Sequence, residues 1–83
     1  MSCPSCKTID QKIAARMRNR RTELGLSTTS LGAAIGVTYQ QVCKYERCVN
    51  RVSASRLYQI AAQLNVPITY FFDDLSSRVT AQV

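Results

Sequence analysis

The chain has 83 residues, of which 46% are hydrophobic and 19% are charged, and its formal net charge is +6. This length suits one small domain, and the composition is that of a globular rather than a disordered protein. No apolar run approaches the roughly 20 residues that span a bilayer, and the first residues, MSCPSCKT, lack the apolar centre of a secretion signal. We therefore expect a cytoplasmic protein, neither membrane-spanning nor secreted.

The positive charge is concentrated in the first part of the chain. Residues 1–51 contain nine Lys and Arg residues against three acidic ones, which accounts for the whole surplus of six. In residues 52–83, two basic and two acidic residues cancel. Such a surplus indicates either a solvated basic surface or a binding surface for a polyanion, with nucleic acid ahead of an anionic membrane.

Helix signals recur along the chain from residue 8. Thr8 and Gln11 have the spacing of a capping box, apolar residues then recur on one helical face, and Gly25 ends this first helix. Three further helix starts are predicted, because an apolar residue precedes each capping residue and another follows four positions after it. The three predicted capping residues are Ser27, Thr38 and Ser53.

The second half of the chain continues the helical pattern. The fourth helix has an apolar stripe from Leu57 to Leu64, and it ends where Asn65 can adopt a left-handed conformation before Pro67. The segment ITYFFDDL predicts a short fifth helix. We predict an all-α fold of five short helices in one domain, residues 8–75, between a flexible leader (1–7) and a C-terminal tail (76–83).

Residues 28–47, TTSLGAAIGVTYQQVCKYER, have the pattern of a helix-turn-helix. Gly32 leaves room for the following helix to approach, and Gly36 lies at the turn, where glycine adopts the required backbone without steric cost. Val42 and Tyr45 are the inward positions of the third helix. Two helices joined by a short glycine-containing turn at this spacing predict a helix-turn-helix.

The outward positions of the third helix are suited to contacts with base edges. Glutamine amides pair with adenine, lysine pairs with guanine acceptors, and aromatic groups contact the thymine methyl. Tyr39, Gln40 and Lys44 lie on one side of the helix, and Cys43 is interpreted as a neutral neighbour of that side. The alternative is that these residues are polar positions facing solvent.

From about Ile13 to Phe72 the chain resembles the DNA-binding domains of the phage lambda-repressor type (Cro/CI, or XRE). The segments RMRNRRTELGLS, LGAAIGVTYQQVCKYER and RLYQIAAQLNVPITYFFD carry the resemblance. It implies a five-helix fold, binding to double-stranded operator DNA as a two-fold dimer, and usually transcriptional repression.

The resemblance also implies roles for particular residues. Arg21 and Glu46 match the positions of a partly buried ion pair. The positions that match contacts to DNA phosphates are Ser27, Thr28, Arg47, Asn50 and Arg51.

The sequence departs from the family pattern at two positions. Cys48 stands where glycine is common after the third helix, which predicts either a different helix end or about 1 kcal/mol of left-handed strain. Thr28 replaces a frequent glutamine, which weakens the case for a phosphate contact from that side chain.

The neutral C-terminal part is the expected dimer surface, because the basic part must face DNA. Its segment NVPITYFFDDL is more apolar than one small core requires. We expect Phe71 or Phe72 to point inward, and the residues shared between two copies to be Ile68, Tyr70 and Leu75. The alternative is that all of them pack within one monomer. In the dimer, the operator is expected to be an inverted repeat with half-site centres about 10 base pairs apart.

The four cysteines predict no metal site. Cys3 and Cys6 have half the spacing of a zinc site, but Cys43 and Cys48 do not complete it, and the chain contains no histidine. The leader thiols are therefore interpreted as incidental. We also predict no enzyme, because the chain lacks a histidine base and a glycine-rich phosphate loop.

The sequence as a whole predicts a bacterial or phage DNA-binding transcriptional regulator that is specific for one DNA sequence. We expect a repressor that acts as a homodimer without a cofactor, metal or small-molecule ligand. One alternative is an antitoxin-like or coactivator-like module that binds protein. A second alternative is a DNA-binding sensor that responds to thiol chemistry or zinc.

Overall fold

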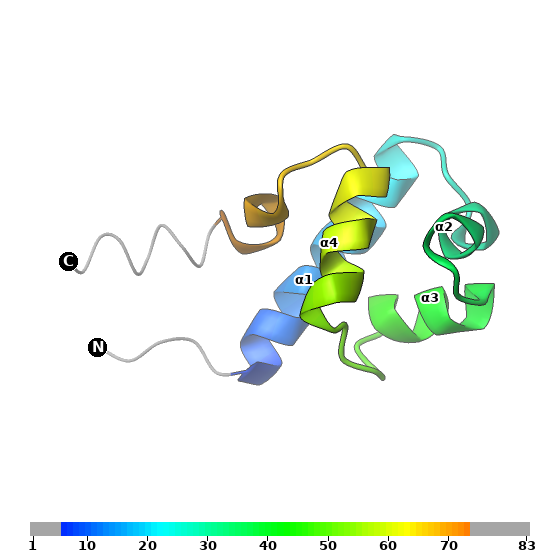
Figure 1. Ribbon diagram of the computed structural model, residues 1–83. Helices are drawn as coiled ribbons and strands as arrows, with labels where there is room; N and C mark the ends of the chain where they lie inside the picture. Colours follow the sequence, from blue (N-terminus) through cyan, green and yellow to red (C-terminus); the bar gives the residue numbers. More distant parts are fainter. Residues whose placement is uncertain (1–5, 74–83) are drawn as a thin grey trace, which may run out of the picture.

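The computed structural model describes residues 6–73, which form four α-helices and one 3-10 helix and contain no strand within that range (Figure 1). The predicted all-α fold is confirmed. The helices are α1 (Cys6–Glu23), α2 (Thr28–Ile35), α3 (Tyr39–Glu46) and α4 (Ala54–Gln63), and the 3-10 helix η1 covers Ile68–Phe72.

The boundaries differ from the predicted ones at both ends of the domain. Helix α1 begins at Cys6, two residues before the predicted start at Thr8. The predicted fifth helix is a 3-10 helix rather than an α-helix. Tyr70 N–H donates to Pro67 O at 2.9 Å, a bond across three residues, and five residues offer little length for the wider α-helical turn. Leu75 lies outside the described residues.

All three predicted capping residues begin their helices. The side-chain oxygens of Ser27, Thr38 and Ser53 accept from the backbone N–H three residues further on. Each of these bonds satisfies one N–H that has no partner within its helix, which stabilises the helix by about 1 kcal/mol. The apolar residues that precede the caps, which are Leu26, Val37 and Val52, pack against the core.

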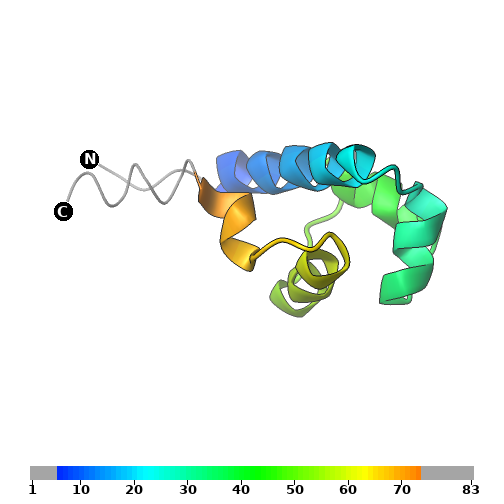
Figure 2. The same cartoon turned by 90° about the horizontal axis from the view of Figure 1, so that it is seen from above.

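The core lies between α1 and the other elements. Figure 2 shows α1 running along one side of the molecule, with η1 next to its first turns and α4 further from it. The largest fully buried side chains come from all five elements or their ends: Met17, Leu31, Val42, Ile60, Leu64 and Phe71. Because every element contributes to one core, α2 and α3 have a fixed position relative to α1.

The approach of α2 to the turn before α3 requires glycine at one position. A Cβ atom added to Gly32 would lie 2.7 Å from Val37 O and 3.2 Å from Thr38 C. Gly36, which ends α2, has a φ of +80° and an open environment. Gly32 is therefore required by close packing, and Gly36 by the conformation of its backbone.

Candidate nucleic-acid interface

Helix α3 has a buried side and an exposed side. Val42 is fully buried and Tyr45 is nearly so, which confirms both as inward residues. On the other side, Tyr39 is 52% exposed, and Gln40 and Lys44 are exposed as well. Cys43 is only half-buried beside them. The fold thus holds the amide, phenol and ammonium groups of one short helix together in solvent.

The orientation of α3 is fixed by an ion pair with α1. Arg21 Nε lies 2.7 Å from Glu46 Oε2, and Arg21 Nη2 donates to Glu46 Oε1 at 3.0 Å. Both side chains are largely buried, with exposed fractions of 13% for Arg21 and 7% for Glu46. A third bond, from Arg21 Nη1 to Leu26 O at 2.8 Å, ties the same guanidinium to the segment before α2. One side chain therefore connects three segments of the domain.

The ion pair also affects the protonation of its arginine. The hydrogen bond with Glu46 raises the pKa of Arg21 above its ordinary value, and the charge of that carboxylate acts in the same direction. Burial opposes this shift by disfavouring the charged form. The net direction is upward, so the ion pair favours the charged form of the guanidinium.

The residues predicted to contact phosphates lie at two places. Ser27 and Thr28 are at the start of α2, where backbone N–H groups lack intrahelical partners. Ser27 Oγ already accepts from Ser30 N–H at 3.0 Å as the cap. Arg47 and Asn50, at the end of α3 and in the loop that follows, are exposed. The two groups are at opposite ends of the helix-turn-helix in sequence, but Thr28 and Arg47 line the same hollow in the structure.

Arg51, in the same loop, has a partner within the domain. Its Nε donates to Asp10 Oδ2 of α1 at 3.0 Å, while its side chain remains 71% exposed. This contact places the guanidinium next to a carboxylate, which the sequence analysis did not predict. Ion pairs at such exposed positions contribute at most about 1 kcal/mol, so a phosphate can still compete for this group.

The end of α3 is strained at Cys48. This residue has a φ of +60°, and Cys48 N–H and Val49 N–H donate to the carbonyls of Tyr45 and Lys44 at 3.1 and 2.9 Å. The helix thus ends in the left-handed conformation that a glycine adopts without cost, and a side chain is present instead. Of the two predicted outcomes, the strained one is observed.

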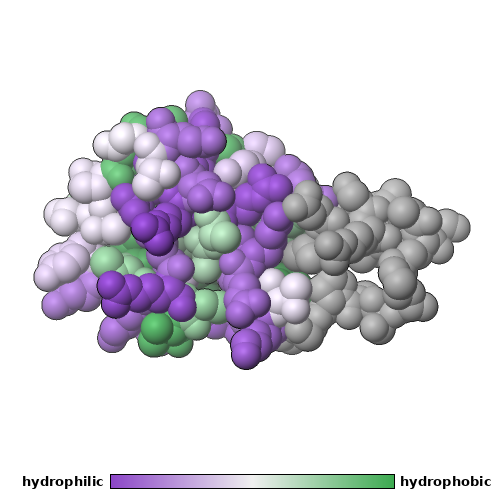
Figure 3. Space-filling view, turned by 180° about the vertical axis from the view of Figure 1, so that it is seen from behind, coloured by the Kyte–Doolittle hydropathy of each residue, from purple (hydrophilic) through white to green (hydrophobic). Residues whose placement is uncertain are grey.

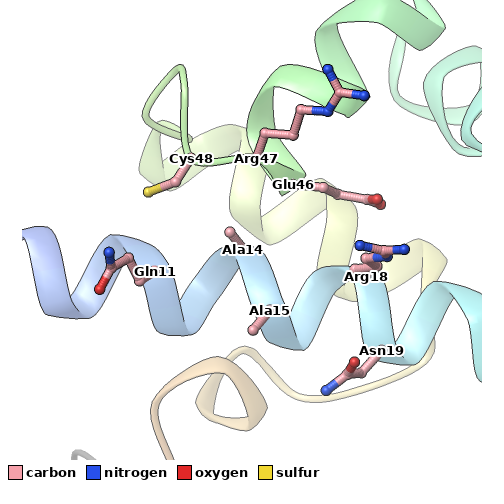
Figure 4. Close-up of a pocket in the computed structure, with 8 residues that line it drawn as sticks. All are labelled: Gln11, Ala14, Ala15, Arg18, Asn19, Glu46, Arg47 and Cys48. Atoms are coloured by element: carbon pink, nitrogen blue, oxygen red, sulfur yellow. The ribbon is translucent and has the colours of Figure 1, made fainter.

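Arg18 was not among the predicted site residues, although it lies close to several of them. It lines a hollow of about 450 Å³ between α1 and the end of α3. Figure 4 shows the residues around it, which are Gln11, Ala14, Ala15, Arg18, Asn19, Glu46, Arg47 and Cys48. The signal in the sequence was helical spacing, because Arg18 is seven residues after Gln11 and three before Arg21.

Two other arginines, Arg20 of the basic part of the chain and Arg56 of the neutral part, bind the protein backbone. Arg20 Nε donates to Leu64 O at 2.9 Å, and Arg56 Nη1 donates to Ile35 O at the end of α2. Both carbonyls lie at or next to helix C-termini, where cationic side chains are favourable. These two residues therefore have structural roles that a charge count does not reveal.

The residues predicted at the dimer surface differ in exposure. Ile68 is 38% exposed, whereas Tyr70 is half-buried, with its ring 4.9 Å from the Arg16 guanidinium carbon and 5.5 Å from the Phe71 ring. Phe71 is fully buried, as expected for one of the two phenylalanines. A second hollow, of about 230 Å³, lies beside Ile68. Its lining residues are Tyr58, Ala61, Ala62, Val66, Pro67 and Ile68.

The described residues contain no cluster that could hold a metal ion. Within residues 6–73, no three His, Cys, Asp or Glu side chains gather at one place, and Cys43 and Cys48 are free thiols. Cys3 lies outside the described residues, as does the side chain of Cys6. No helix in the described part of the chain is long and apolar enough to cross a membrane.

A helix-turn-helix with its second helix exposed on a basic chain defines a class of DNA-binding proteins. Residues 17–71 match the model of the HTH_3 helix-turn-helix family, and the chain belongs to this family. The predicted resemblance to lambda-repressor-type domains is thereby confirmed. The family and its named relatives are transcriptional regulators rather than enzymes, as predicted.

Relatives in bacteria are named as transcriptional regulators. An HTH-type transcriptional regulator of Sinorhizobium medicae is 52% identical over 66 residues, which cover 80% of this chain and 48% of that protein. A transcriptional regulator in the ATPase CF(0) region of Rhodospirillum rubrum is 55% identical over 67 residues, or 81% of this chain and 62% of that one. The chain thus spans less than two thirds of the length of either relative.

Solved structures share the fold. The restriction-modification controller protein C.AhdI of Aeromonas hydrophila has a TM-score of 0.72 and 28% identity, over 76% of this chain and 96% of that one. The P22 c2 repressor in complex with a synthetic operator has a TM-score of 0.67 and 24% identity, over 71% and 89%. The second similarity is evidence for the fold alone.

Proposed function

We propose that the protein is a repressor that binds an inverted-repeat operator as a homodimer. The observation that carries this proposal is the exposed side of α3, where polar groups that suit base edges stand on a helix fixed by its buried side. The protein would work in the cytoplasm, on chromosomal or phage DNA, without a cofactor.

The proposed contacts to bases come from one side of α3. Tyr39, Gln40 and Lys44 would contact base edges in the major groove, with Cys43 as a neutral neighbour. Their support is their exposure beside a buried Val42 and Tyr45, because an inward position could not reach DNA.

The proposed contacts to phosphates flank that helix. Arg47, Asn50 and Arg51 would bind the backbone from the end of α3, and Ser27 and Thr28 from the start of α2. A free N–H group at a helix start binds an anion without help from its side chain, so Ser27 could contribute even though its hydroxyl is used as a cap. Arg51 would exchange Asp10 for a phosphate.

The proposed dimer uses the surface around η1. One helix-turn-helix contacts few base pairs, and pairing two domains doubles the number of contacts. Ile68, Tyr70 and Leu75 would be shared between copies, and Leu75 lies outside the described residues. Exposed apolar side chains at Ile68 and Tyr58, beside an apolar hollow, support this surface.

Selection of bound sequences from a random DNA pool tests this function most directly. We expect one enriched sequence with two-fold symmetry and half-site centres about 10 base pairs apart. Sedimentation equilibrium of the protein with that duplex should give two protein chains per operator. An enriched site without symmetry, bound at full affinity by one chain, would contradict the dimer. A reporter gene placed behind the operator then distinguishes repression from activation.

A further inference from the structure

Arg18 and Arg47 line two adjoining hollows beside the helix-turn-helix. The larger one, of about 450 Å³, lies between α1 and the end of α3. The smaller one, of about 200 Å³, extends toward the start of α2 and the side of α3, where it is lined by Thr28 and Cys43. Glu46 and both arginines line each hollow, and in Figure 4 the Glu46 carboxylate lies between the two guanidinium groups.

The charges around the two hollows are not balanced. Both oxygens of Glu46 bind Arg21, at 2.7 and 3.0 Å. Neither Arg18 nor Arg47 has a side-chain hydrogen bond or ion pair with any residue in the range 6–73, and both are exposed. Two positive charges therefore stand beside the hollows with no anion assigned to them, which creates a local attraction for a negatively charged group.

The lining of the larger hollow suits a phosphate. Ala14 and Ala15 leave space between longer side chains, and the amide groups of Gln11 and Asn19 of α1 also line this hollow (Figure 4). Amide N–H and guanidinium groups are the usual donors to phosphate oxygens in protein–DNA complexes. The view of the molecule from the α1 side shows mainly hydrophilic side chains, with hydrophobic residues in separate small areas (Figure 3).

We propose that this groove binds a phosphate of the DNA backbone, with Arg18 of α1 as the principal contact and Arg47 as the second. The proposal rests on the DNA-binding function above and adds a contact from outside the helix-turn-helix. The occupant is a DNA phosphate rather than a small anion, because Thr28 at the start of α2 and Cys43 on the side of α3 line the smaller hollow, next to the helix proposed to enter the major groove. A duplex placed along α3 would bring its backbone to both arginines at once.

Arg18→Gln tests the proposal, because the side chain has no partner within the described residues and its loss should leave the fold intact. Binding to the selected operator and to a scrambled duplex would be measured by fluorescence anisotropy at several salt concentrations. We expect affinity to fall by about three- to tenfold on both duplexes, and the slope of log K against log salt to become shallower by about 0.9, the value for one phosphate. Arg18→Lys should retain the slope of the wild type.

Gln63→Glu is a matched control. It changes the net charge by the same amount as Arg18→Gln, and it lies at the end of α4, exposed and away from α3 (Figure 1). We expect its salt slope to stay within error of the wild type. Ethylation interference gives a second measurement. In the wild type, one phosphate should inhibit binding when ethylated, and this effect should be absent with Arg18→Gln.

The possible failures are distinguishable. If Arg18→Gln and Gln63→Glu give the same salt slope and interference pattern, the groove does not bind DNA and the proposal is overturned. If Arg18→Gln abolishes binding of inorganic phosphate but leaves the affinity and salt slope for DNA unchanged, the groove binds only a free anion, which also overturns it. Failure of the wild type to select any DNA sequence would instead contradict the proposed function itself.

Discussion

Arg21 and Glu46 form a two-pronged ion pair, with nitrogen–oxygen distances of 2.7 and 3.0 Å, that links α1 to the last residue of α3. The pair is largely buried, and Arg21 also donates to Leu26 O before α2. It therefore fixes the angle of α3, and of its exposed side, relative to α1. A change in either residue should affect stability and DNA binding together.

A double-mutant cycle of Arg21→Met and Glu46→Gln tests the energy of this pair. We expect each single variant to lose about 3 kcal/mol of unfolding free energy, because the remaining group keeps the cost of leaving water without its partner. The double variant should lose less than the sum of the two. Urea unfolding measures all four proteins. A coupling energy below about 0.3 kcal/mol would mean that the pair behaves like an exposed one.

Gly32→Ala should destabilise the protein by about 2 kcal/mol, even though alanine favours helices. The new methyl group would meet Val37 O at 2.7 Å, and a backbone carbonyl cannot move aside without disturbing the turn. Gly36→Ala is the matched comparison. Its site is open, so only the left-handed backbone should cost energy, about 1 kcal/mol. Thermal unfolding measures the stability of both variants. Equal losses of stability would contradict the separate roles of Gly32 in close packing and Gly36 in backbone conformation.

Replacing Cys48 by glycine should increase stability by about 0.5–1 kcal/mol. The residue has a φ of +60°, and glycine adopts this conformation without the steric cost of a Cβ atom. Cys48→Ser is the control, because it removes the thiol and keeps the Cβ. Both variants are measured by urea unfolding. If Cys48→Ser stabilised the protein as much as Cys48→Gly, the source of strain would be the thiol rather than the backbone.

Gln40→Ala and Lys44→Ala should each weaken operator binding by about 1–3 kcal/mol and reduce the preference at one base pair. Both side chains are exposed on the same side of α3. Arg51→Ala should instead weaken binding equally on all sequences and reduce the salt dependence. The preference of each variant at each base pair is measured by competition between the operator and duplexes altered at single positions. Identical specificity profiles for Gln40→Ala and Arg51→Ala would show that the roles are assigned wrongly.

Ile68→Asp should dissociate the proposed dimer. The side chain is 38% exposed at the start of η1, so the substitution should leave the monomer folded while it places a charge in the apolar contact. We expect a monomer by sedimentation equilibrium and a loss of operator affinity. Gln63→Glu changes the charge by the same amount and should remain dimeric. A dimer that persists in Ile68→Asp would place the interface elsewhere.

The local features of the fold were predictable because each depends on a few neighbouring residues. The caps at Ser27, Thr38 and Ser53 and the left-handed residue Asn65, with a φ of +57°, follow from side chains within four positions. The requirement for Gly32 was also visible, because the spacing of a helix-turn-helix fixes which residue faces the turn.

Contacts between distant segments were harder to predict. Arg20 and Leu64 are 44 residues apart, and Arg51 and Asp10 are 41 apart, so their contacts exist only after α1 packs against the other helices. The pairing of Arg21 with Glu46 came from family resemblance rather than from any local pattern. Helical spacing relates Arg18 to Gln11 and Arg21, but the groove beside it could not be predicted, because two helices form it.

The hydrogen bond from Arg20 to Leu64 O changes how the charge of the chain should be interpreted. Arg20 and Arg56 hold their cationic groups against backbone carbonyls, and Arg21 shares its charge with Glu46. These guanidinium groups remain with the protein when DNA arrives, so they release few counterions. The salt slope of binding should therefore be smaller than the number of basic residues suggests. Engineering stronger DNA binding would best begin at Arg18 and Arg47, which are exposed and have no side-chain partner within residues 6–73.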